Sequence, residues 1–309
     1  MPVDAKHLAA RRELAQGISA VERPGPAANQ RIQQALAASA ADARNALVVG
    51  LTGAPGAGKS SLAAALADVA RAAGRRVAIL AIDPSSHESG GALLGDRVRI
   101  DEHPDDDGRF TRSIATRGSG RSLAHVAAAA TILVEAAGFD LIFVETVGAG
   151  QAEIGIARLA DVLLVVEGPE GGDEVQAMKA GILEVADVVA VNKSDRPGAQ
   201  AAFDRLRSGL ALGAGAPQLA LVSATAGAGI SELLATIDAA AGADRGVRGR
   251  IRRVEAHLVA AAESHVDAQV REATASGALT TRAEQIVAGT QSLTGSLTTL
   301  FGISESPDA

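Results

Sequence analysis

Seven short aliphatic runs, most of them separated by segments with a helical pattern, constrain the fold of this chain more than any other feature. Each run is continuous rather than alternating in polarity, as is typical of strands that helices cover on both faces of a mostly parallel sheet. The pattern therefore predicts an α/β fold with a mostly parallel central sheet flanked by helices. The expected strands are residues 47–51, 76–82, 110–115, 141–145, 162–166, 188–191 and 219–222.

A glycine-rich segment follows the first expected strand and precedes a helical pattern rich in Ala and Leu. It fits G-x-x-x-x-G-K-[ST] in the strand, loop, helix context that this motif requires. In such a P-loop, backbone N–H groups and the helix dipole bind phosphate oxygens, the lysine reaches the β- and γ-phosphates, and the hydroxyl takes a Mg²⁺ position. The sequence thus predicts a P-loop NTPase. Its expected phosphate-binding residues are Gly53, Ala54, Pro55, Gly56, Ala57, Gly58, Lys59, Ser60 and Ser61.

A second motif, N-K-x-D, stands after the sixth expected strand at Asn192, Lys193 and Asp195. A carboxylate at this position accepts from both N1–H and the exocyclic amine of guanine, whereas adenine leaves it without a donor. The lysine stem covers one face of the base, and the asparagine ties this loop to the P-loop. After the next strand, Ser223 and Ala224 are expected to supply a backbone N–H for the guanine carbonyl oxygen. These residues predict GTP and GDP as the nucleotides.

Two further expected strands end in carboxylates, Asp83 and Glu145. The carboxyl ends of parallel strands face one crevice, so both side chains are expected beside the P-loop. Together with Ser60 and with Asp96, which lies in a glycine-rich segment of the kind that orders around a γ-phosphate, they are the candidate Mg²⁺ ligands. The alternative for each acid is an ordinary structural role, as a turn cap or a solvated loop residue.

Catalytic roles follow from the same placement. A Mg²⁺ ion offsets the charge that develops in phosphoryl transfer, and a nearby carboxylate orients or deprotonates the attacking water. Gly148 is placed to offer its N–H to the γ-phosphate, and Gln151 to position water, although a polar helix start explains Gln151 equally well. The candidate catalytic residues are Lys59, Asp83, Glu145 and Gln151.

Composition excludes several other classes. With aromatic residues at 2% and a formal net charge of −7, the chain lacks both a stacking platform for bases and a basic footprint, so no nucleic-acid partner is expected. The 0 Cys exclude thiolate chemistry, and the 6 His are scattered without an i, i+4 pair, so no transition-metal site is expected. The acidic segment 101–108 lacks the spacing of a calcium loop and is interpreted as an exposed turn. No apolar run is long enough for a membrane span or a signal peptide, which favours a cytoplasmic protein.

Helical patterns without strands mark both ends of the chain. We expect an N-terminal helical extension over residues 1–45, the P-loop domain over 46–242 and a C-terminal helical extension over 243–309. Near the C-terminus, apolar residues recur every seven positions and predict an apolar stripe on one helix face. The stripe either packs back on the domain or forms a homodimer arm. The basic run 245–253 is interpreted as a solvated helix start rather than a ligand site. The stripe consists of Leu279, Ile286, Leu293 and Leu300, with Ala283 and Leu297 between them.

Taken together, these motifs resemble the MeaB-type GTPases, also labelled ArgK, that accompany methylmalonyl-CoA mutase and related adenosylcobalamin-dependent acyl-CoA mutases. The resemblance covers roughly residues 47–240. The segments that carry it are residues 53–61, 83–86 with 90–97, 112–118, 145–153, 172–174 with 179–181, and 192–195.

The resemblance implies a Mg²⁺-dependent GTPase domain that hydrolyses GTP slowly and so guards or reloads the cofactor of its partner mutase. It also implies a homodimer, and it assigns Arg97, Asp173 and Lys179 to switch segments that communicate with the partner. Ion pairing at the surface is the alternative for Asp173 and Lys179. Two other functions stay open at this point: a P-loop kinase of a small molecule, and a nucleotide-switch GTPase with a different partner.

Overall fold

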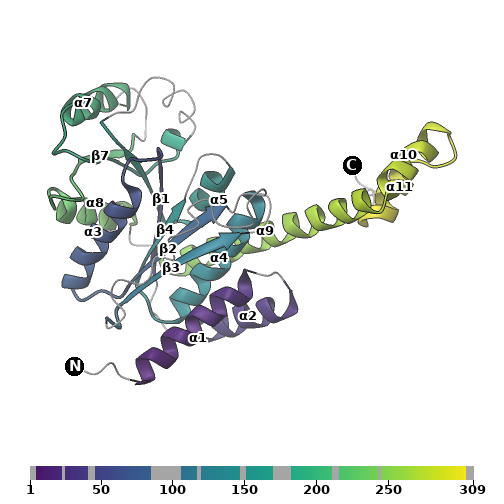
Figure 1. The fold of residues 1–309 in the computed structure, drawn as a ribbon, viewed down its shortest axis with the longest axis horizontal. Coiled ribbons are helices and arrows are strands. Elements are labelled where there is room, and N and C mark those ends of the chain that lie inside the picture. The colour runs from purple at the N-terminus through teal and green to yellow at the C-terminus, as the bar shows by residue number, and fades with distance from the viewer. Residues whose placement is uncertain are drawn as a thin grey trace. The chain divides into compact units, whose positions relative to one another are not determined.

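One parallel sheet forms the centre of the chain, as a computed structural model shows (Figure 1). The model describes residues 5–22, 25–40, 46–84, 106–116, 120–146, 151–169, 182–210, 216–242 and 245–303. Within these residues the strand order is β3-β2-β4-β1-β5-β6-β7, and every neighbouring pair is parallel. The strands are β1 (Leu47–Gly53), β2 (Val77–Pro84), β3 (Arg109–Thr116), β4 (Leu141–Thr146), β5 (Val162–Glu167), β6 (Val188–Val191) and β7 (Gln218–Leu221).

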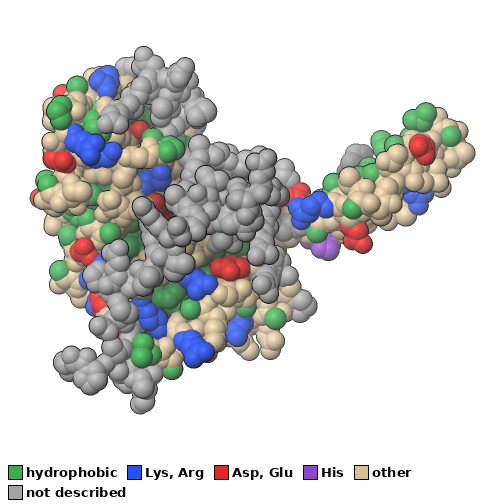
Figure 2. Space-filling view, in the orientation of Figure 1, with side chains coloured by type: hydrophobic (Ala, Val, Ile, Leu, Met, Phe, Trp, Pro, Cys, Tyr) green, Lys and Arg blue, Asp and Glu red, His purple; other side chains and the backbone are tan. Residues whose placement is uncertain are grey.

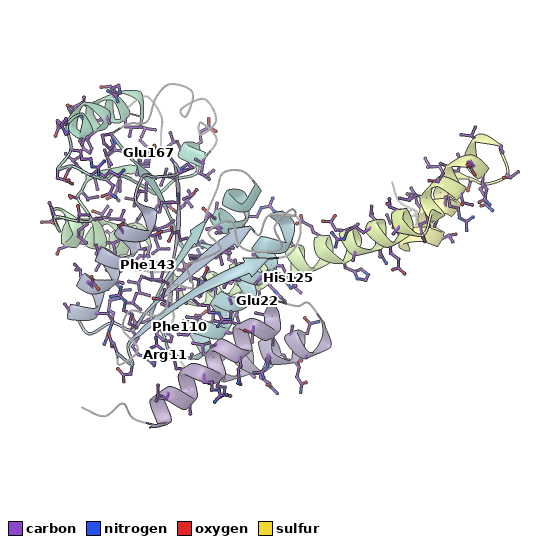
Figure 3. All side chains as sticks on the ribbon, in the orientation of Figure 1. Arg11, Glu22, Phe110, His125, Phe143 and Glu167 are labelled. Carbon is purple, nitrogen blue, oxygen red and sulfur yellow. The ribbon has the colours of Figure 1, made fainter. Side chains whose placement is uncertain are left out.

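This sheet confirms the predicted α/β fold, and each strand ends within two residues of its predicted bounds. The strands are continuous apolar runs because both of their faces are covered. Phe143 of β4, labelled in Figure 3, is fully buried on the face of α3, while its neighbours Ile142 and Val144 are buried on the opposite face. Since successive side chains of a strand point to opposite faces, only uninterrupted apolar runs fill both layers.

The helices divide between the two faces of the sheet (Figure 1). One face is covered by α3 (Lys59–Ala72) and α8 (Ile230–Ala240). The opposite face is covered by the apolar helix α4, by α5 and, near β6 and β7, by α7. The bounds of these three are α4 (Gly120–Ala136), α5 (Gln151–Leu159) and α7 (Ala199–Leu210).

The N-terminal helices α1 (Ala5–Val21) and α2 (Pro26–Ala40) pack on α4. Their buried residues Ile18, Val21 and Ile32 join the core on this face of the sheet. They belong to the same compact unit as the sheet, which extends over Met1–His257, and Leu258–Ala309 forms a second unit. The functional boundaries at residues 45 and 242 stay predictions.

The basic run 245–253 is not a solvated helix start throughout, which corrects the interpretation from sequence. It opens helix α9 (Arg245–Ala275), and the side chain of Arg253 is 0% exposed. Arg250 donates to the carbonyl of Ser39 at 2.6 Å, and Arg252 donates to the carbonyl of Ala160 at 2.6 Å. These arginines attach α9 to α2 and to the end of α5.

The second unit contains two helices beyond α9, namely α10 (Ala278–Val287) and α11 (Leu293–Phe301). The prediction of one stripe on one helix face is therefore wrong. Gly289, at φ 72°, lies in the turn after α10, and the Ser292 side chain accepts from the N–H of Gly295 to cap α11. The left-handed conformation favours glycine, and a serine cap starts a new helix, so the sevenfold spacing runs over two helices.

Candidate functional site

The P-loop connects the carboxyl end of β1 to the first turn of α3 through backbone that only glycine adopts readily. Gly53 has φ 138°, and a Cβ there would lie 2.0 Å from the carbonyl oxygen of Val166. Gly58 has φ 90°, and a Cβ there would lie 2.5 Å from Nδ2 of Asn192. The loop therefore depends on its glycines for both conformation and close approach. It leads into the N-terminus of α3, where helix N–H groups and the macrodipole favour an anion.

Lys59 lies over this loop. Its ammonium group donates to the carbonyls of Gly53 and Ala54 at 3.0 and 3.1 Å, and the residue is 8% exposed. A buried ammonium group therefore lies beside the loop amides at the helix N-terminus. This electrostatic arrangement suits a polyphosphate.

Ser60 and Glu145 are in contact, although they lie 85 positions apart in the sequence. The hydroxyl of Ser60, in the first turn of α3, donates to the carboxylate of Glu145 at the end of β4, which is 2% exposed. A hydroxyl and a carboxylate are the oxygen ligands that Mg²⁺ prefers, so this pair fits the expected ion. The structure thus brings two of the predicted Mg²⁺ ligands together.

Asp83 lies at the same edge of the sheet. Strand pairing aligns Ala81 of β2 with Glu145, and Asp83 follows two residues later in β2. Its side chain is outside the described residues, as is the side chain of Gln151 at the start of α5. The remaining predicted residues Asp96, Arg97, Gly148, Asp173 and Lys179 lie entirely outside the described part of the chain.

Asn192 joins the expected base loop to the P-loop. Its Nδ2 donates to the carbonyl of Ala57 at 3.0 Å and to that of Gly58 at 3.4 Å. Its Oδ1 accepts from the N–H of Ala224 at 3.0 Å, so this N–H meets Asn192 rather than standing open for a base. Lys193 follows at φ 63°, a conformation that non-glycine residues rarely adopt.

Asp195 is exposed, and Ser223 orients it. The hydroxyl of Ser223 donates to the Asp195 carboxylate and accepts from the N–H of Ala226 at 3.2 Å. The hydrogen bond from Ser223 lowers the pKa of Asp195 below its ordinary value, with smaller contributions from Arg196 and Lys193. Asp195 is therefore ionised at neutral pH, as an acceptor for two guanine donors must be.

Sequence reasoning missed two features of this site. It assigned Ser223 a backbone role, whereas its hydroxyl holds Asp195. It also passed over Glu167, a buried carboxylate at the carboxyl end of β5 that is labelled in Figure 3. The carbonyl of Glu167 accepts from the N–H of Asn192 at 2.8 Å. The available signal was the one used for Glu145, an acid that ends an aliphatic run.

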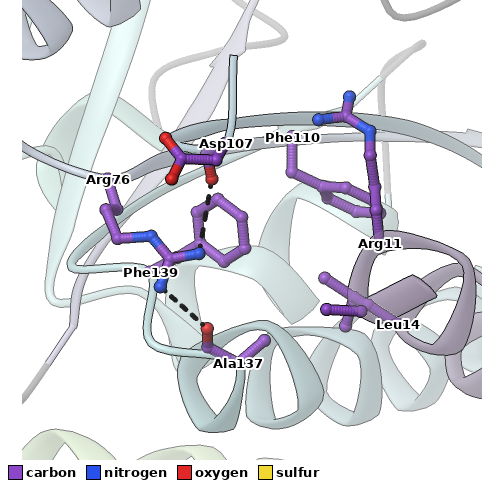
Figure 4. Close-up of a pocket in the computed structure, with 8 residues that line it drawn as sticks. Arg11, Leu14, Arg76, Asp107, Phe110, Ala137 and Phe139 are labelled. Carbon is purple, nitrogen blue, oxygen red and sulfur yellow. Dashed lines mark hydrogen bonds between the residues drawn. The ribbon is translucent and has the colours of Figure 1, made fainter. Parts of the chain in front are cut away.

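A small cavity of about 50 Å³ lies away from this site, where α1 meets the amino ends of the strands (Figure 4). The guanidinium of Arg76 stacks over Phe139 at 4.7 Å and donates to the carbonyls of Ala137 and Asp107. Arg11 of α1 lies 5.8 Å from the centre of the Phe110 ring and donates to the carbonyl of Arg109 at 2.7 Å. The contacts of Arg11 attach α1 to the domain.

A parallel sheet with this loop after its central strand defines a P-loop nucleotide-binding protein. The family model described as Methylmalonyl Co-A mutase-associated GTPase MeaB matches residues 14–278. The chain therefore belongs to the MeaB family, which confirms the resemblance seen in the motifs.

Individual relatives agree with this assignment. A protein of Mycobacterium tuberculosis named as a GTPase is 36% identical over 239 residues, which are 74% of this chain and 70% of the relative. A Pyrococcus abyssi protein, also named as a GTPase, is 49% identical over 168 residues, 54% of this chain and 52% of its own. The mouse mitochondrial protein named methylmalonic aciduria type A homolog is 42% identical over 147 residues, 48% of this chain and 35% of its own. The match thus spans about half the length of the Pyrococcus relative.

A solved structure shares the fold. The crystal structure of an LAO/AO transport system kinase superposes with a TM-score of 0.59, covering 97% of this chain and 98% of the other at 23% identity. Among the helices that the structure of this chain describes, none has the length and apolar character needed to cross a membrane.

Proposed function

We propose that this protein is a Mg²⁺-dependent GTPase that hydrolyses GTP to GDP and phosphate. The observation that carries the proposal is the double contact of Asn192, which holds the N-K-x-D loop against the P-loop carbonyls. A phosphate site and a guanine site on one rigid frame fix the distance between the two ends of a nucleotide. Membership of the MeaB family supports the same activity.

Each part of the site has a chemical role in this proposal. The P-loop amides and Lys59 bind the phosphates, and Asp195, held ionised by Ser223, accepts from N1–H and the exocyclic amine of guanine. Ser60 and Glu145, with Asp83 and Asp96, would hold Mg²⁺, which when bound supplies charge stabilisation for the transferring phosphoryl group. Gln151 and Gly148 are assigned to the attacking water and the γ-phosphate.

Calorimetry with GTP and ATP, each with Mg²⁺, tests the nucleotide choice. GTP is expected to bind at least about 100-fold more tightly, because adenine leaves the Asp195 carboxylate without its donors. Equal binding of both nucleotides contradicts the guanine site, and binding of neither contradicts the whole assignment. Transfer of phosphate from ATP to a small-molecule acceptor would instead favour the P-loop kinase.

We further propose that the GTPase acts as a chaperone or regulator of an adenosylcobalamin-dependent acyl-CoA mutase of the methylmalonyl-CoA mutase type, gating the loading or protection of its cofactor. The family description supports this partner, and Arg97, Asp173 and Lys179 are the residues assigned to its switch segments. Affinity capture in the presence of a GTP analogue or GDP tests it. The mutase should be recovered in a nucleotide-dependent amount, and a different partner recovered in its place contradicts this proposal.

A homodimer is the oligomeric state that we propose. The second unit exposes apolar side chains, seen in green in Figure 2, among them Val287 and Leu293 at 88% and 64% exposure. Large apolar side chains on a small helical unit are more stable against a partner surface than in water, and a second copy offers the same surface.

A further inference from the structure

Three aspartates, which we call strand clamps, stand directly before strands and hold the amino end of a neighbouring strand. Asp140, Asp161 and Asp187 precede β4, β5 and β6. Their carboxylates accept from the N–H of Arg76 at 3.0 Å, of Val48 at 2.9 Å and of Leu163 at 2.7 Å, in that order. Each contact satisfies a backbone donor at the amino edge of the sheet, the edge opposite the P-loop.

Asp161 differs from the other two because a helix from the far end of the chain reaches it. Its side chain is 2% exposed and accepts from Nη1 of Arg253 on α9 at 3.1 Å. Nη2 of Arg253 donates to both carboxylate oxygens of Glu135 on α4, at 3.0 and 2.9 Å. Glu135 in turn accepts from the N–H of Ala46, just before β1, at 3.4 Å. We call Glu135, Asp161 and Arg253 the anchor cluster.

The helix backbone also approaches this cluster closely. A Cβ on Gly249 would lie 2.6 Å from Oδ1 of Asp161 and 3.0 Å from Nη1 of Arg253, so a larger residue there would displace one of these charged groups. Arg252 adds its bond to the carbonyl of Ala160, the residue before Asp161. The first turns of α9 therefore contact residues 160–161 through the side chains of Arg252 and Arg253 and through the close approach of Gly249.

The anchor cluster is incompletely satisfied. Among the residues that the structure describes, neither Oδ1 of Asp161 nor Nε of Arg253 has a hydrogen-bond partner, and Oδ1 of Asp161 has only a longer ion pair with Arg252, at 3.9 Å. Buried charged groups that lack part of their hydrogen bonds offset much of the attraction between them. The attraction that holds α9 on residues 160–161 is therefore partly offset, and two polar atoms of the cluster remain able to accept or donate a further hydrogen bond.

Helix α5 connects residues 160–161 to the carboxyl edge of the sheet, where the P-loop lies. It begins at Gln151, five residues after β4 ends at Thr146, and ends at Leu159, directly before residues 160–161. Its packing on β1 is tight, since a Cβ on Gly50 would lie 2.7 Å from Cγ2 of Ile156. Because this nine-residue helix leads directly into residues 160–161, a displacement of the whole helix would alter the position of the anchor cluster.

We propose that the anchor cluster couples the nucleotide state of the P-loop to the seating of α9, by which we mean the packing of its first turns on residues 160–161. Helix α5 is the connecting element. The proposal rests on the GTP site proposed above. By linkage, a nucleotide that shifts the seating equilibrium of α9 by a given factor binds the two seating states with affinities that differ by the same factor, so altering the anchor cluster should alter nucleotide affinity. The cluster lies at the first turns of α9, the helix that continues into the second unit.

Hydrogen exchange of the full-length chain tests the coupling, with Mg²⁺ and either GDP or a non-hydrolysable GTP analogue. Amide exchange in residues 248–257 is expected to differ between the two nucleotides. Asp161→Asn keeps an acceptor for Val48 but removes the charge, and should abolish most of that difference. It should also change the ratio of the two dissociation constants about fivefold, within the usual range for coupled sites. Asp187→Asn, the same change at the neighbouring strand clamp, should leave both quantities as in the wild type.

Equal exchange in wild-type protein with both nucleotides bound overturns the coupling and leaves the GTP site intact. An Asp161→Asn effect no larger than that of Asp187→Asn also overturns the coupling and leaves the GTP site intact. If Asp161→Asn does not fold, Arg252→Gln, which removes the bond to Ala160 from a partly exposed side chain, must reduce the difference in its place. Absence of binding of both nucleotides overturns the GTP site and the coupling with it.

Discussion

At the level of single residues, Asn192 shows how one side chain can position a binding site. Its amide donates to two P-loop carbonyls and accepts from Ala224, so both of its polar atoms are engaged. A buried amide satisfied from both sides resists displacement, because breaking one bond leaves an unpaired polar group. Asp195, three residues later, is held in turn by Ser223. The base loop is therefore positioned by hydrogen bonds to the P-loop and to the end of β7.

Asp195→Asn should convert the nucleotide preference. The amide offers one donor and one acceptor, which match the C2 carbonyl and N1–H of xanthine, whereas guanine requires two acceptors. GTP binding should weaken about 10- to 100-fold, from the loss of a hydrogen bond to a charged group, and xanthosine triphosphate should bind more tightly than it does to the wild type. Calorimetry measures both. Asp204→Asn on α7, an exposed acid away from the site, serves as the control. Retained guanine preference contradicts the role of Asp195.

A pair of histidines gives the protein a pH response. The rings of His125 on α4 and His257 on α9 lie 4.5 Å apart, which sequence spacing gave no reason to expect. Burial lowers the pKa of His125 to about 4, with a smaller contribution from repulsion by His257 when that ring is protonated, and burial also lowers the pKa of His257. Both rings are neutral in the folded protein at pH 7, and protonation favours the unfolded chain.

Acid should therefore destabilise the protein in a defined window. The unfolded pKa of His is about 6.5, so stability is complete above that pH and falls as the pH drops toward the folded value near 4. In His125→Phe, which keeps an aromatic ring beside His257, the fall in melting temperature between pH 7 and pH 5 should be smaller than in the wild type. His265→Gln, at an exposed position, should follow the wild type. Identical pH profiles for all three proteins contradict this role of the pair.

At the scale of elements, aspartates before strands align the sheet. An acid in this position accepts from a backbone N–H that no strand pairing satisfies, because it lies at the start of the neighbouring strand. The same chemistry is used three times, yet the surroundings differ. Asp140 is 41% exposed and pairs with Arg75, whereas Asp161 is buried under α9. An aspartate before a strand therefore aligns the neighbouring strand at Asp140, and at Asp161 it also attaches the helix α9.

Asp187→Ala measures the value of one strand clamp. The change leaves the N–H of Leu163 without its acceptor at the buried start of β5, so the free energy of unfolding should fall by about 1–3 kcal/mol. Urea denaturation at pH 7 gives this quantity. Asp204→Ala on the surface of α7 should change it by less than about 0.5 kcal/mol. A fall for Asp187→Ala no larger than that of the control contradicts the clamp.

At the scale of the whole molecule, the chain consists of a nucleotide-binding unit and a small helical unit that share the helix α9. The first has a dense aliphatic core on both faces of its sheet, and the second leaves large apolar side chains in contact with water. A unit with this surface is suited to association, and the proposed homodimer uses it.

Charge in the apolar surface of the second unit should separate the dimer. Leu293→Asp and Val287→Asp together place two carboxylates at positions that are 64% and 88% exposed, so the monomer tolerates them while a second copy would have to bury them. Sedimentation velocity should show a dimer for the wild type and a monomer for this variant at the same concentration. Thr280→Asp, at an exposed polar position of α10, should remain dimeric. A wild-type monomer, or a dimeric double variant, contradicts the proposed interface.

Local sequence patterns were sufficient to predict the seven strands, the P-loop and the N-K-x-D loop, because each depends on constraints within a short segment. Continuous apolar runs define strands covered on both faces, and the left-handed conformation at Gly58 requires its residue type. Gly289 and Ser292 are local signals for the break between α10 and α11, but the prediction followed the sevenfold spacing instead.

Contacts between residues far apart in the sequence became visible only in the folded chain. Arg253 lies in a basic run that predicts a solvated helix, yet its side chain is fully buried between Glu135 and Asp161, which are 118 and 92 positions away. The contacts of His125 with His257 and of Ser223 with Asp195 have the same origin. Periodicity tells which face of an element is buried but not what covers it, because the covering element is chosen by packing of the whole chain.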